Sequence, residues 1–199
     1  KKLDKFYPRS FNMGIRHDVY MELEGFSKMR FGEDIDFSIR IFKAGKRCRL
    51  FPEAWVWHKR RTDFRKFYRQ VYNSGIARIN LYKKYPESLL PMVFTVGIIF
   101  LALLLCIGLF FSFAPSLSSA SKAIGIFLCI CVIIPVLLYS LLILLDSTLQ
   151  NKSIKIGFLS IRAAFVQLMG YGFGFLEAWW KRCIKGKDEF AAFEKNFYK

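Results

Sequence analysis

Residues 32–45, which read GEDIDFSIRIFKAG, are the most informative stretch of the chain. Ile35, Ile39 and Phe42 recur at the spacing of one helix face, and Gly45 stands where a glycine often ends a helix. We therefore expect a single helix that takes up most of this stretch.

Three carboxylates lie in the first turn of this expected helix, at Glu33, Asp34 and Asp36. The partial positive charge at a helix N-terminus favours ionised carboxylates there. An ionised carboxylate held at the edge of a sheet can act as a general base that deprotonates a hydroxyl. Acidic residues at this place can also simply cap the helix, and taken alone these residues favour that simpler interpretation.

The segments around this helix predict a mixed α/β domain. Phe11–Ile15, Arg47–Phe51 and Ala54–His58 are short and partly apolar, as strands are, and Pro52 separates the last two. Arg16–Leu23 predicts one more short helix. The expected fold class is therefore α/β, followed by transmembrane helices.

The charge pattern predicts those transmembrane helices. The net charge is +16, yet Lys122 is the one charged residue between Leu89 and Leu145. Residues 89–113 and 120–145 each exceed the roughly 20 apolar residues that cross a bilayer core, so they predict a helical hairpin. The basic residues beside the spans suit anionic membrane lipids, and they predict that both flanks face the cytoplasm.

Residues 154–180 are apolar but carry Arg162, Gln167 and Glu177. An arginine at the centre of a membrane helix costs about 2.5–3.5 kcal/mol on insertion scales. An even number of crossings also keeps both basic flanks on one side. We therefore expect two spans and a third segment that lies on the surface or is re-entrant.

Residues 63–85 predict an amphipathic helix. Phe64, Phe67, Val71 and Ile76 fall near one face, and Lys and Arg residues supply the charge. Such a helix suits a membrane surface. The alternative is a helix that packs on the soluble domain.

Several motifs together resemble those of family 2 glycosyltransferases. The first is an Asn followed by a short apolar run and a basic residue, at 12–16, and the second is a Gly-Phe pair at 25–26. An acidic helix at 32–41 and a Gly turn at 44–45 follow. Pro52 and His58 also fall where the family often has Pro and His, whereas Phe37 and Ile41 replace its usual leucines. The resemblance covers residues 9–88.

The resemblance implies a GT-A fold, a nucleotide-sugar donor and inversion at the anomeric carbon. Asp34 would then be the general base, and Glu33 and Asp36 would support and orient it. The resemblance and the basic character of the neighbouring segment assign substrate binding to His58, Arg60, Arg61, Arg69 and Gln70. His58 can equally be a structural residue at a strand end, and the arginines after it can equally bind lipid headgroups.

The resemblance also implies a divalent metal, Mg²⁺ or Mn²⁺, that stabilises the leaving nucleoside diphosphate. Family members usually hold it with an Asp-x-Asp motif in the first half of the domain, and His58 is a tentative further ligand. The one such motif here, Asp34 to Asp36, belongs to the base. Because Lys is residue 1, we expect a piece of a longer protein. Because no further Asp-x-Asp motif is present, we expect this piece to lack the nucleotide-binding half and to be inactive alone.

The acceptor is expected to be a lipid-linked or cell-surface glycan. Processive relatives carry Gln-x-x-Arg-Trp where this chain has Gln70, Asn73 and Ser74, which favours transfer of one sugar or a few. The alternative is a non-enzymatic basic adaptor that binds anionic lipid, and no nucleic-acid partner is expected. The expected location is the inner membrane of the cell, with the catalytic part in the cytoplasm.

The sequence thus predicts four parts. They are the end of a GT-A catalytic domain at 1–62, an interfacial helix at 63–88, a transmembrane hairpin at 89–145, and a membrane-associated segment with a basic cytoplasmic tail at 146–199. Five cysteines are present without the spacing of a zinc site, which fits polar parts in a reducing compartment.

Overall fold

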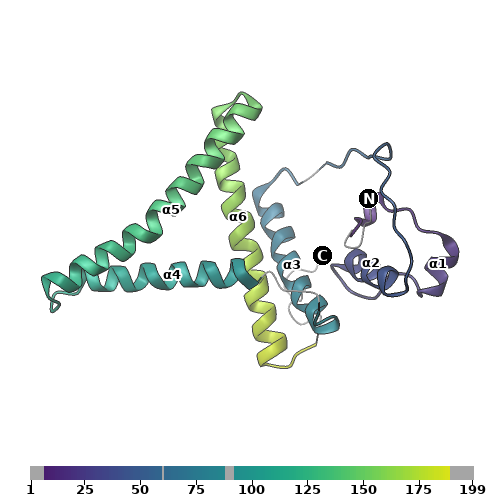
Figure 1. Cartoon of the computed structure of the whole chain (residues 1–199), viewed down its shortest axis with the longest axis horizontal. Coiled ribbons are helices and arrows are strands. Elements are labelled where there is room, and N and C mark those ends of the chain that lie inside the picture. Colours follow the sequence, from purple (N-terminus) through teal and green to yellow (C-terminus); the bar gives the residue numbers. More distant parts are fainter. Residues whose placement is uncertain (1–6, 60, 88–91, 189–199) are drawn as a thin grey trace. The chain divides into compact units, whose positions relative to one another are not determined.

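The computed structural model describes residues 7–59, 61–87 and 92–188, with the backbone alone at residues 92–96 and 98. Most of these residues are helical (Figure 1). The helices are α1 (His17–Glu22), α2 (Glu33–Lys43), α3 (Phe64–Lys84), α4 (Met92–Phe113), α5 (Ser119–Asn151) and α6 (Ile154–Trp179), with a 3₁₀ turn at Ser10–Asn12 and a π-helical turn at Trp180–Ile184. The chain forms two compact units, one with residues 1–89 and 174–199 and the other with residues 90–173.

The three strands predicted for the first unit are wrong, since none of the residues that the structure describes is in a strand. Residues 11–15 begin in the 3₁₀ turn, and residues 47–51 and 54–58 lack regular structure. A strand needs a neighbouring strand to pair its backbone groups, and a sequence pattern cannot supply that neighbour. The large side chains of this region are correspondingly open, with Trp57 91% exposed.

Helix α2 forms as predicted, and its start depends on a glycine. Gly32 precedes the helix with a φ of +85°, which side chains other than hydrogen rarely allow. A Cβ at this position would also lie 3.3 Å from Cδ1 of Leu81 in α3. The buried side chains of Ile39, Leu81 and Tyr85 then form a small core between α2 and the end of α3.

Helix α3 begins at a regular cap, because the side chain of Asp63 accepts a hydrogen bond from the backbone N–H of Lys66 at 2.9 Å. Its second half is buried within the first unit, at Ile76, Ile79 and Leu81. The second half of α3 therefore fits the alternative of a helix that packs on the soluble domain better than that of a helix on a membrane surface. The interfacial position of the first half stays a prediction.

In the second unit, α4 and α5 pack closely where both carry a glycine. A Cβ at Gly125 would lie 2.7 Å from the carbonyl oxygen of Gly108 and 2.7 Å from the backbone nitrogen of Ser112. Small residues allow such backbone-to-backbone contact between apolar helices. Helices α5 and α6 are joined further by a 2.6 Å hydrogen bond between the hydroxyls of Ser147 and Ser160.

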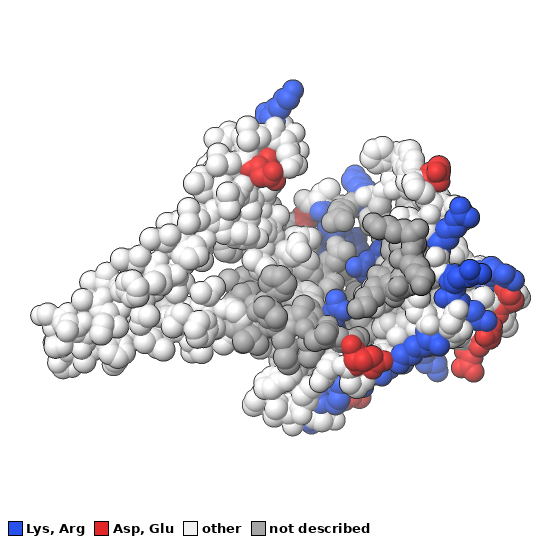
Figure 2. Space-filling view, viewed as in Figure 1, with Lys and Arg blue, Asp and Glu red and all other residues white. Residues whose placement is uncertain are grey.

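Two described helices are long and apolar enough to cross a membrane, Ser119–Asn151 and Ile154–Ile184. Side chains along α5, such as Leu142 and Leu149, are exposed, and Figure 2 shows a nearly uncharged surface over α4 and α5. A contiguous apolar surface of this kind fits contact with lipid. In α4, the described apolar part is the shorter Ile99–Phe113.

Residues 154–180, predicted to lie on the surface or to be re-entrant, lie in one continuous helix that meets the same length and composition criterion as α5. The number of crossings stays a prediction.

We expect Gly125→Ala to lower the midpoint of thermal unfolding in detergent. The added methyl group would meet backbone atoms, which cannot move aside as a flexible side chain can, and overpacking of this kind costs roughly 1–3 kcal/mol. Gly97→Ala in α4 is the matched control, because a Cβ there meets nothing within 4 Å. Equal midpoints for the two variants would contradict the close packing of α4 on α5.

Candidate functional site

The candidate site is the acidic first turn of α2, in which Asp34 is buried but has fewer polar contacts than Asp36. Its Oδ1 accepts a hydrogen bond from the backbone N–H of Ile35 at 2.8 Å. Its Oδ2 lies 3.6 Å from Nη1 of Arg9, and the side chain is 11% exposed. The carboxylate is therefore held at the helix N-terminus, with one oxygen next to the exposed cation of Arg9.

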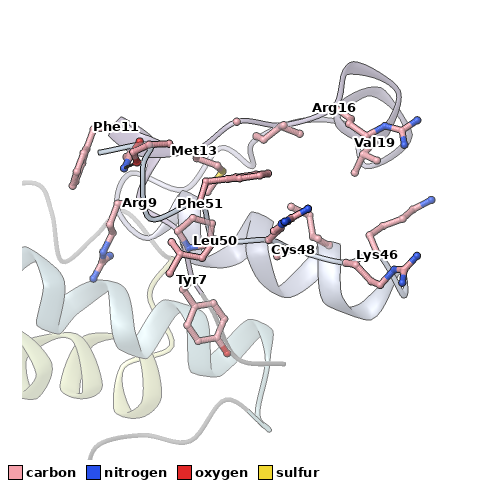
Figure 3. A pocket seen from close by; sticks show the side chains of 18 residues that line it. Tyr7, Arg9, Phe11, Met13, Arg16, Val19, Lys46, Cys48, Leu50 and Phe51 are labelled. Atoms are coloured by element: carbon pink, nitrogen blue, oxygen red, sulfur yellow. Dashed lines mark hydrogen bonds between the residues drawn. The ribbon is translucent and has the colours of Figure 1, made fainter. Parts of the chain in front are cut away.

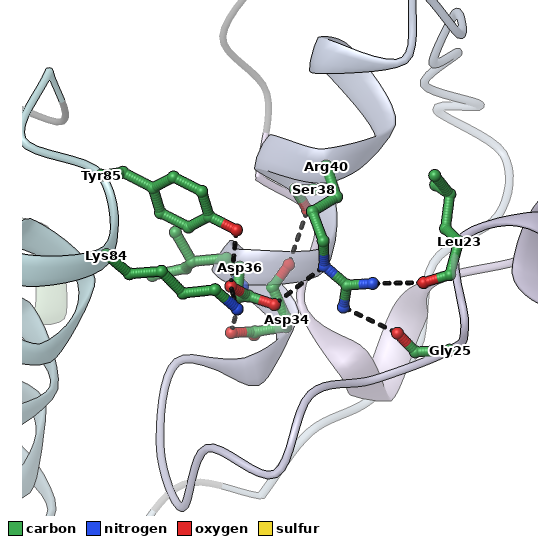
Figure 4. Close-up of polar contacts among 9 residues, drawn as sticks. Leu23, Gly25, Asp34, Asp36, Ser38, Arg40, Lys84 and Tyr85 are labelled. Carbon is green, nitrogen blue, oxygen red and sulfur yellow. Dashed lines mark hydrogen bonds and ion pairs between the residues drawn. The ribbon is translucent and has the colours of Figure 1, made fainter. Parts of the chain in front are cut away.

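Asp36, two residues further on, is fully enclosed (Figure 4). Its Oδ1 accepts a hydrogen bond from the Tyr85 hydroxyl at 2.8 Å and lies 2.5 Å from Nζ of Lys84. Its Oδ2 accepts from Nε of Arg40 at 3.0 Å. Both oxygens are thus occupied, so Asp36 cannot take a proton from a substrate hydroxyl.

Arg40 extends this network to the loop before α2. Its guanidinium donates to the carbonyl oxygen of Leu23 and, at 2.7 Å, to that of Gly25 (Figure 4). One carboxylate therefore joins α2, the end of α3 and the loop after α1 through its partners.

The surroundings of Asp36 determine its charge. Burial raises the pKa of its carboxyl, but hydrogen bonds from Lys84 and Tyr85 outweigh burial and hold that pKa below the ordinary value of 3.8. Burial and the hydrogen bond to Asp36 raise the pKa of Tyr85 well above its usual range. At neutral pH Asp36 is therefore ionised, and Tyr85 is protonated and able to donate.

The other predicted site residues lie apart from this network. Glu33 is half-buried in the same turn of α2. His58 is exposed, and its ring stacks on that of Phe11 with centroids 4.3 Å apart. Arg61 is also exposed, and Arg60 lies outside the described residues.

The remaining two candidates, Arg69 and Gln70, lie in the first half of α3, half-buried and exposed respectively. Among the described residues, no hydrogen bond or ion pair joins the acidic turn to His58, Arg61 or Gln70. Their assignment to substrate binding stays a prediction.

Three residues of the site have no signal in the sequence. Arg9 precedes Asp34 by 25 positions, and Lys84 and Tyr85 follow Asp36 by 48 and 49. Each has other basic or aromatic residues close to it in the sequence, so its residue type does not single it out. Only the packing of α3 on α2 distinguishes Lys84 from Lys83 beside it.

A groove of about 620 Å³ runs between residues 7–19 and 41–54, with Arg9 at its edge (Figure 3). Three of its five cations are ion-paired with carboxylates, namely Arg9 with Asp34, Arg16 with Asp18 and Lys46 with Glu22. The groove is also lined by the apolar side chains of Phe11, Met13, Leu50 and Phe51. It therefore offers an apolar surface with less free positive charge than its composition suggests.

The described residues do not fit a divalent metal. No group of three His, Cys, Asp or Glu side chains in the described part could hold an ion. Asp36 cannot contribute, because its oxygens are already occupied. The predicted Mg²⁺ or Mn²⁺, and His58 as its ligand, therefore stay predictions.

Asp36→Asn should destabilise the protein at pH 7. Because the folded pKa of Asp36 is depressed, its contribution is complete above 3.8 and is lost as the pH falls through the lower folded value. We expect a loss of roughly 2–3 kcal/mol at pH 7, less than for a fully buried pair because the Lys84 side chain is 42% exposed.

Denaturant unfolding in detergent, followed by tryptophan fluorescence at several pH values, measures this loss. The difference in the free energy of unfolding between the unchanged protein and Asp36→Asn should disappear as the pH falls below 3.8. A gap that stays constant down to low pH would show that the charge of Asp36 does not matter.

Comparisons with known proteins bear on this site. The model of the family described as "Glycosyl transferase family group 2" matches residues 11–145. Two curated relatives are 31% identical to this chain over 103 residues, which is 51% of this chain. Both are pre-mycofactocin glycosyltransferases of Mycobacterium tuberculosis, from strains CDC 1551 / Oshkosh and ATCC 25618 / H37Rv. The chain spans 22% of the length of these relatives. No solved structure matches.

The family match contains the acidic turn, α3, α4 and α5 as far as residue 145. It confirms the resemblance that the motifs around residues 32–41 indicate. Because it takes in more than half of the sequence, the chain belongs to glycosyltransferase family group 2.

Proposed function

We propose that this chain supplies the general base of a membrane-bound inverting glycosyltransferase, and that Asp34 is that base. The observation that carries this proposal is the contrast between Asp34 and Asp36, two of the three carboxylates of the turn. Asp36 is enclosed by three donors, whereas among the described residues Oδ2 of Asp34 is paired with Arg9 alone, at 3.6 Å.

In the proposed reaction, Oδ2 of Asp34 takes the proton of an acceptor hydroxyl as the hydroxyl oxygen attacks the anomeric carbon of the donor sugar. The bond from that carbon to the nucleoside diphosphate breaks, and its electron pair leaves with the diphosphate. Attack from the face opposite the leaving group inverts the anomeric carbon. Asp34 then returns its proton to water.

Two features of the chain support Asp34 in this role. The partial positive charge at the N-terminus of α2 attracts the carboxylate of Asp34, because Asp34 lies in the first turn. Arg9, with a side chain 61% exposed, balances that charge without enclosing it. An arriving hydroxyl can therefore displace Arg9 at little cost.

The donor and the fold of the whole enzyme are part of the proposal. Family membership supports a nucleotide-sugar donor and a GT-A fold for the whole enzyme. A divalent metal is proposed on the same ground. No step above depends on it, since the described residues do not form its site.

For the acceptor we propose a lipid-linked or cell-surface glycan, reached at the cytoplasmic face of the inner membrane. The apolar helices α5 and α6 support a membrane location, and the basic residues on both flanks support the cytoplasmic side. The alternative of a basic lipid adaptor has less support, because three of the five cations around the groove already have carboxylate partners.

Asp34→Asn tests the proposed base. In the protein as its gene encodes it, this change should lower turnover about 10²–10⁴-fold, the usual contribution of a general base. Release of nucleoside diphosphate from a panel of nucleotide-sugars, with membrane extract as acceptor, measures it.

Asp18→Asn is the matched control, because this exposed carboxylate pairs only with Arg16 in the described part and should be dispensable. If Asp34→Asn and Asp18→Asn both retain the turnover of the unchanged protein, Asp34 is not the base.

A further inference from the structure

The last part of the chain lies beyond the family match, yet the end of α6 packs on α3 within the first unit. The Tyr72 hydroxyl donates to the Glu177 carboxylate. Nη1 of Arg182 donates to Oδ1 of Asn80 at 2.5 Å, and Nζ of Lys83 donates to the carbonyl oxygen of Arg182 at 3.0 Å. These contacts extend over three turns of α3, so the end of α6 and the π-helical turn that follows it lie along α3 over that length.

The two backbones also approach closely at one point. A Cβ at Gly174 would lie 2.0 Å from the carbonyl oxygen of Tyr72. Phe175 and Ala178, which follow Gly174 in α6, are buried. The end of α6 is therefore a packed part of the first unit.

Another face of α3 holds the acidic turn. Leu81 and Ala77 lie against Gly32, at 3.3 and 3.6 Å from where its Cβ would be. Lys84 and Tyr85, at the end of α3, hold the carboxylate of Asp36. Helix α3 thus contacts the end of α6 on one side and the start of α2 on another.

We propose that the end of α6 and α3 together form a brace that positions Asp34, with Lys84 and Tyr85 as positioning residues that act through Asp36. The inference rests on the proposed function, because Asp34 is the group whose position matters. Asp34 and Asp36 share one helical turn, so the contacts on Asp36 fix the backbone that carries Asp34. A displacement of about 1 Å at a reacting group can cost 10²-fold in rate.

The near end of the brace is tested with Tyr85→Phe in the protein as its gene encodes it. Loss of one hydroxyl should lower kcat roughly tenfold and leave KM for donor and acceptor within about twofold, because placement of the base rather than binding is affected. Tyr82→Phe is the matched control, since Tyr82 is half-buried in the same helix and its hydroxyl has no partner among the described residues.

Lys84 gives a second test at the same place. Lys84→Met should lower kcat as Tyr85→Phe does, and Lys84→Arg should restore it, because a guanidinium can still pair with Asp36. A residue needed only for folding would change the yield of folded protein and leave kcat per folded molecule unchanged. That result would overturn the positioning role.

The far end of the brace is tested with Gly174→Ala, which places a methyl group against the backbone of Tyr72. It should lower kcat severalfold with KM unchanged, although it lies far along the sequence from Asp34. Gly172→Ala is the matched control, because a Cβ at Gly172 meets nothing within 4 Å.

The outcomes separate this inference from the proposed function. If Asp34→Asn loses turnover but each variant behaves like its control, the brace is wrong and the general base stands. If Asp34→Asn keeps full turnover, the proposed function fails, and the brace fails with it.

Discussion

The ionised carboxylate of Asp36, enclosed inside the first unit, is the interaction on which the local structure depends. Removing a carboxylate from water is costly unless its oxygens are supplied with donors. Here three donors come from two places in the chain: Arg40 in the body of α2, and Lys84 and Tyr85 at the end of α3. Because Arg40 also holds the carbonyls of Leu23 and Gly25, satisfying one charge joins three segments.

This arrangement divides the work between two residues of the same chemistry. Residues two apart on a helix face nearly opposite directions, so Asp34 and Asp36 meet different surroundings. Asp36 faces inward and holds the structure together, and Asp34 remains beside Arg9 at the start of the helix. A rigid, buried anchor next to an available base is the arrangement that proton transfer at a fixed position requires.

Much of this fold can be predicted from the sequence, because local spacing determines it. The apolar spacing of residues 35–42 predicts α2, and the long uncharged runs predict the apolar helices. The strands were wrong because a strand requires a partner that its own sequence does not name. The apolar run at 154–179 forms one continuous helix, but its place relative to a membrane depends on surroundings that its sequence does not contain.

The site is less predictable than the fold. The acidic turn is visible as a motif, but nothing local distinguishes the base from the anchor. That distinction depends on Lys84 and Tyr85, nearly 50 positions away, and on Arg9 on the other side. The close approaches at Gly125 and Gly174 are likewise set by packing between helices, and a glycine in an apolar run does not by itself reveal them.

The most direct test of this division of work is the denaturant midpoint of Asp34→Asn, measured beside Asp36→Asn at pH 7. A group that takes part in the reaction but does not stabilise the fold can be replaced with little loss of stability. The free energy of unfolding of Asp34→Asn should therefore stay within about 1 kcal/mol of that of the unchanged protein. The Asp36→Asn midpoint should fall clearly below both. If Asp34→Asn unfolds as easily as Asp36→Asn, both carboxylates are structural anchors and the account given for the acidic turn is wrong.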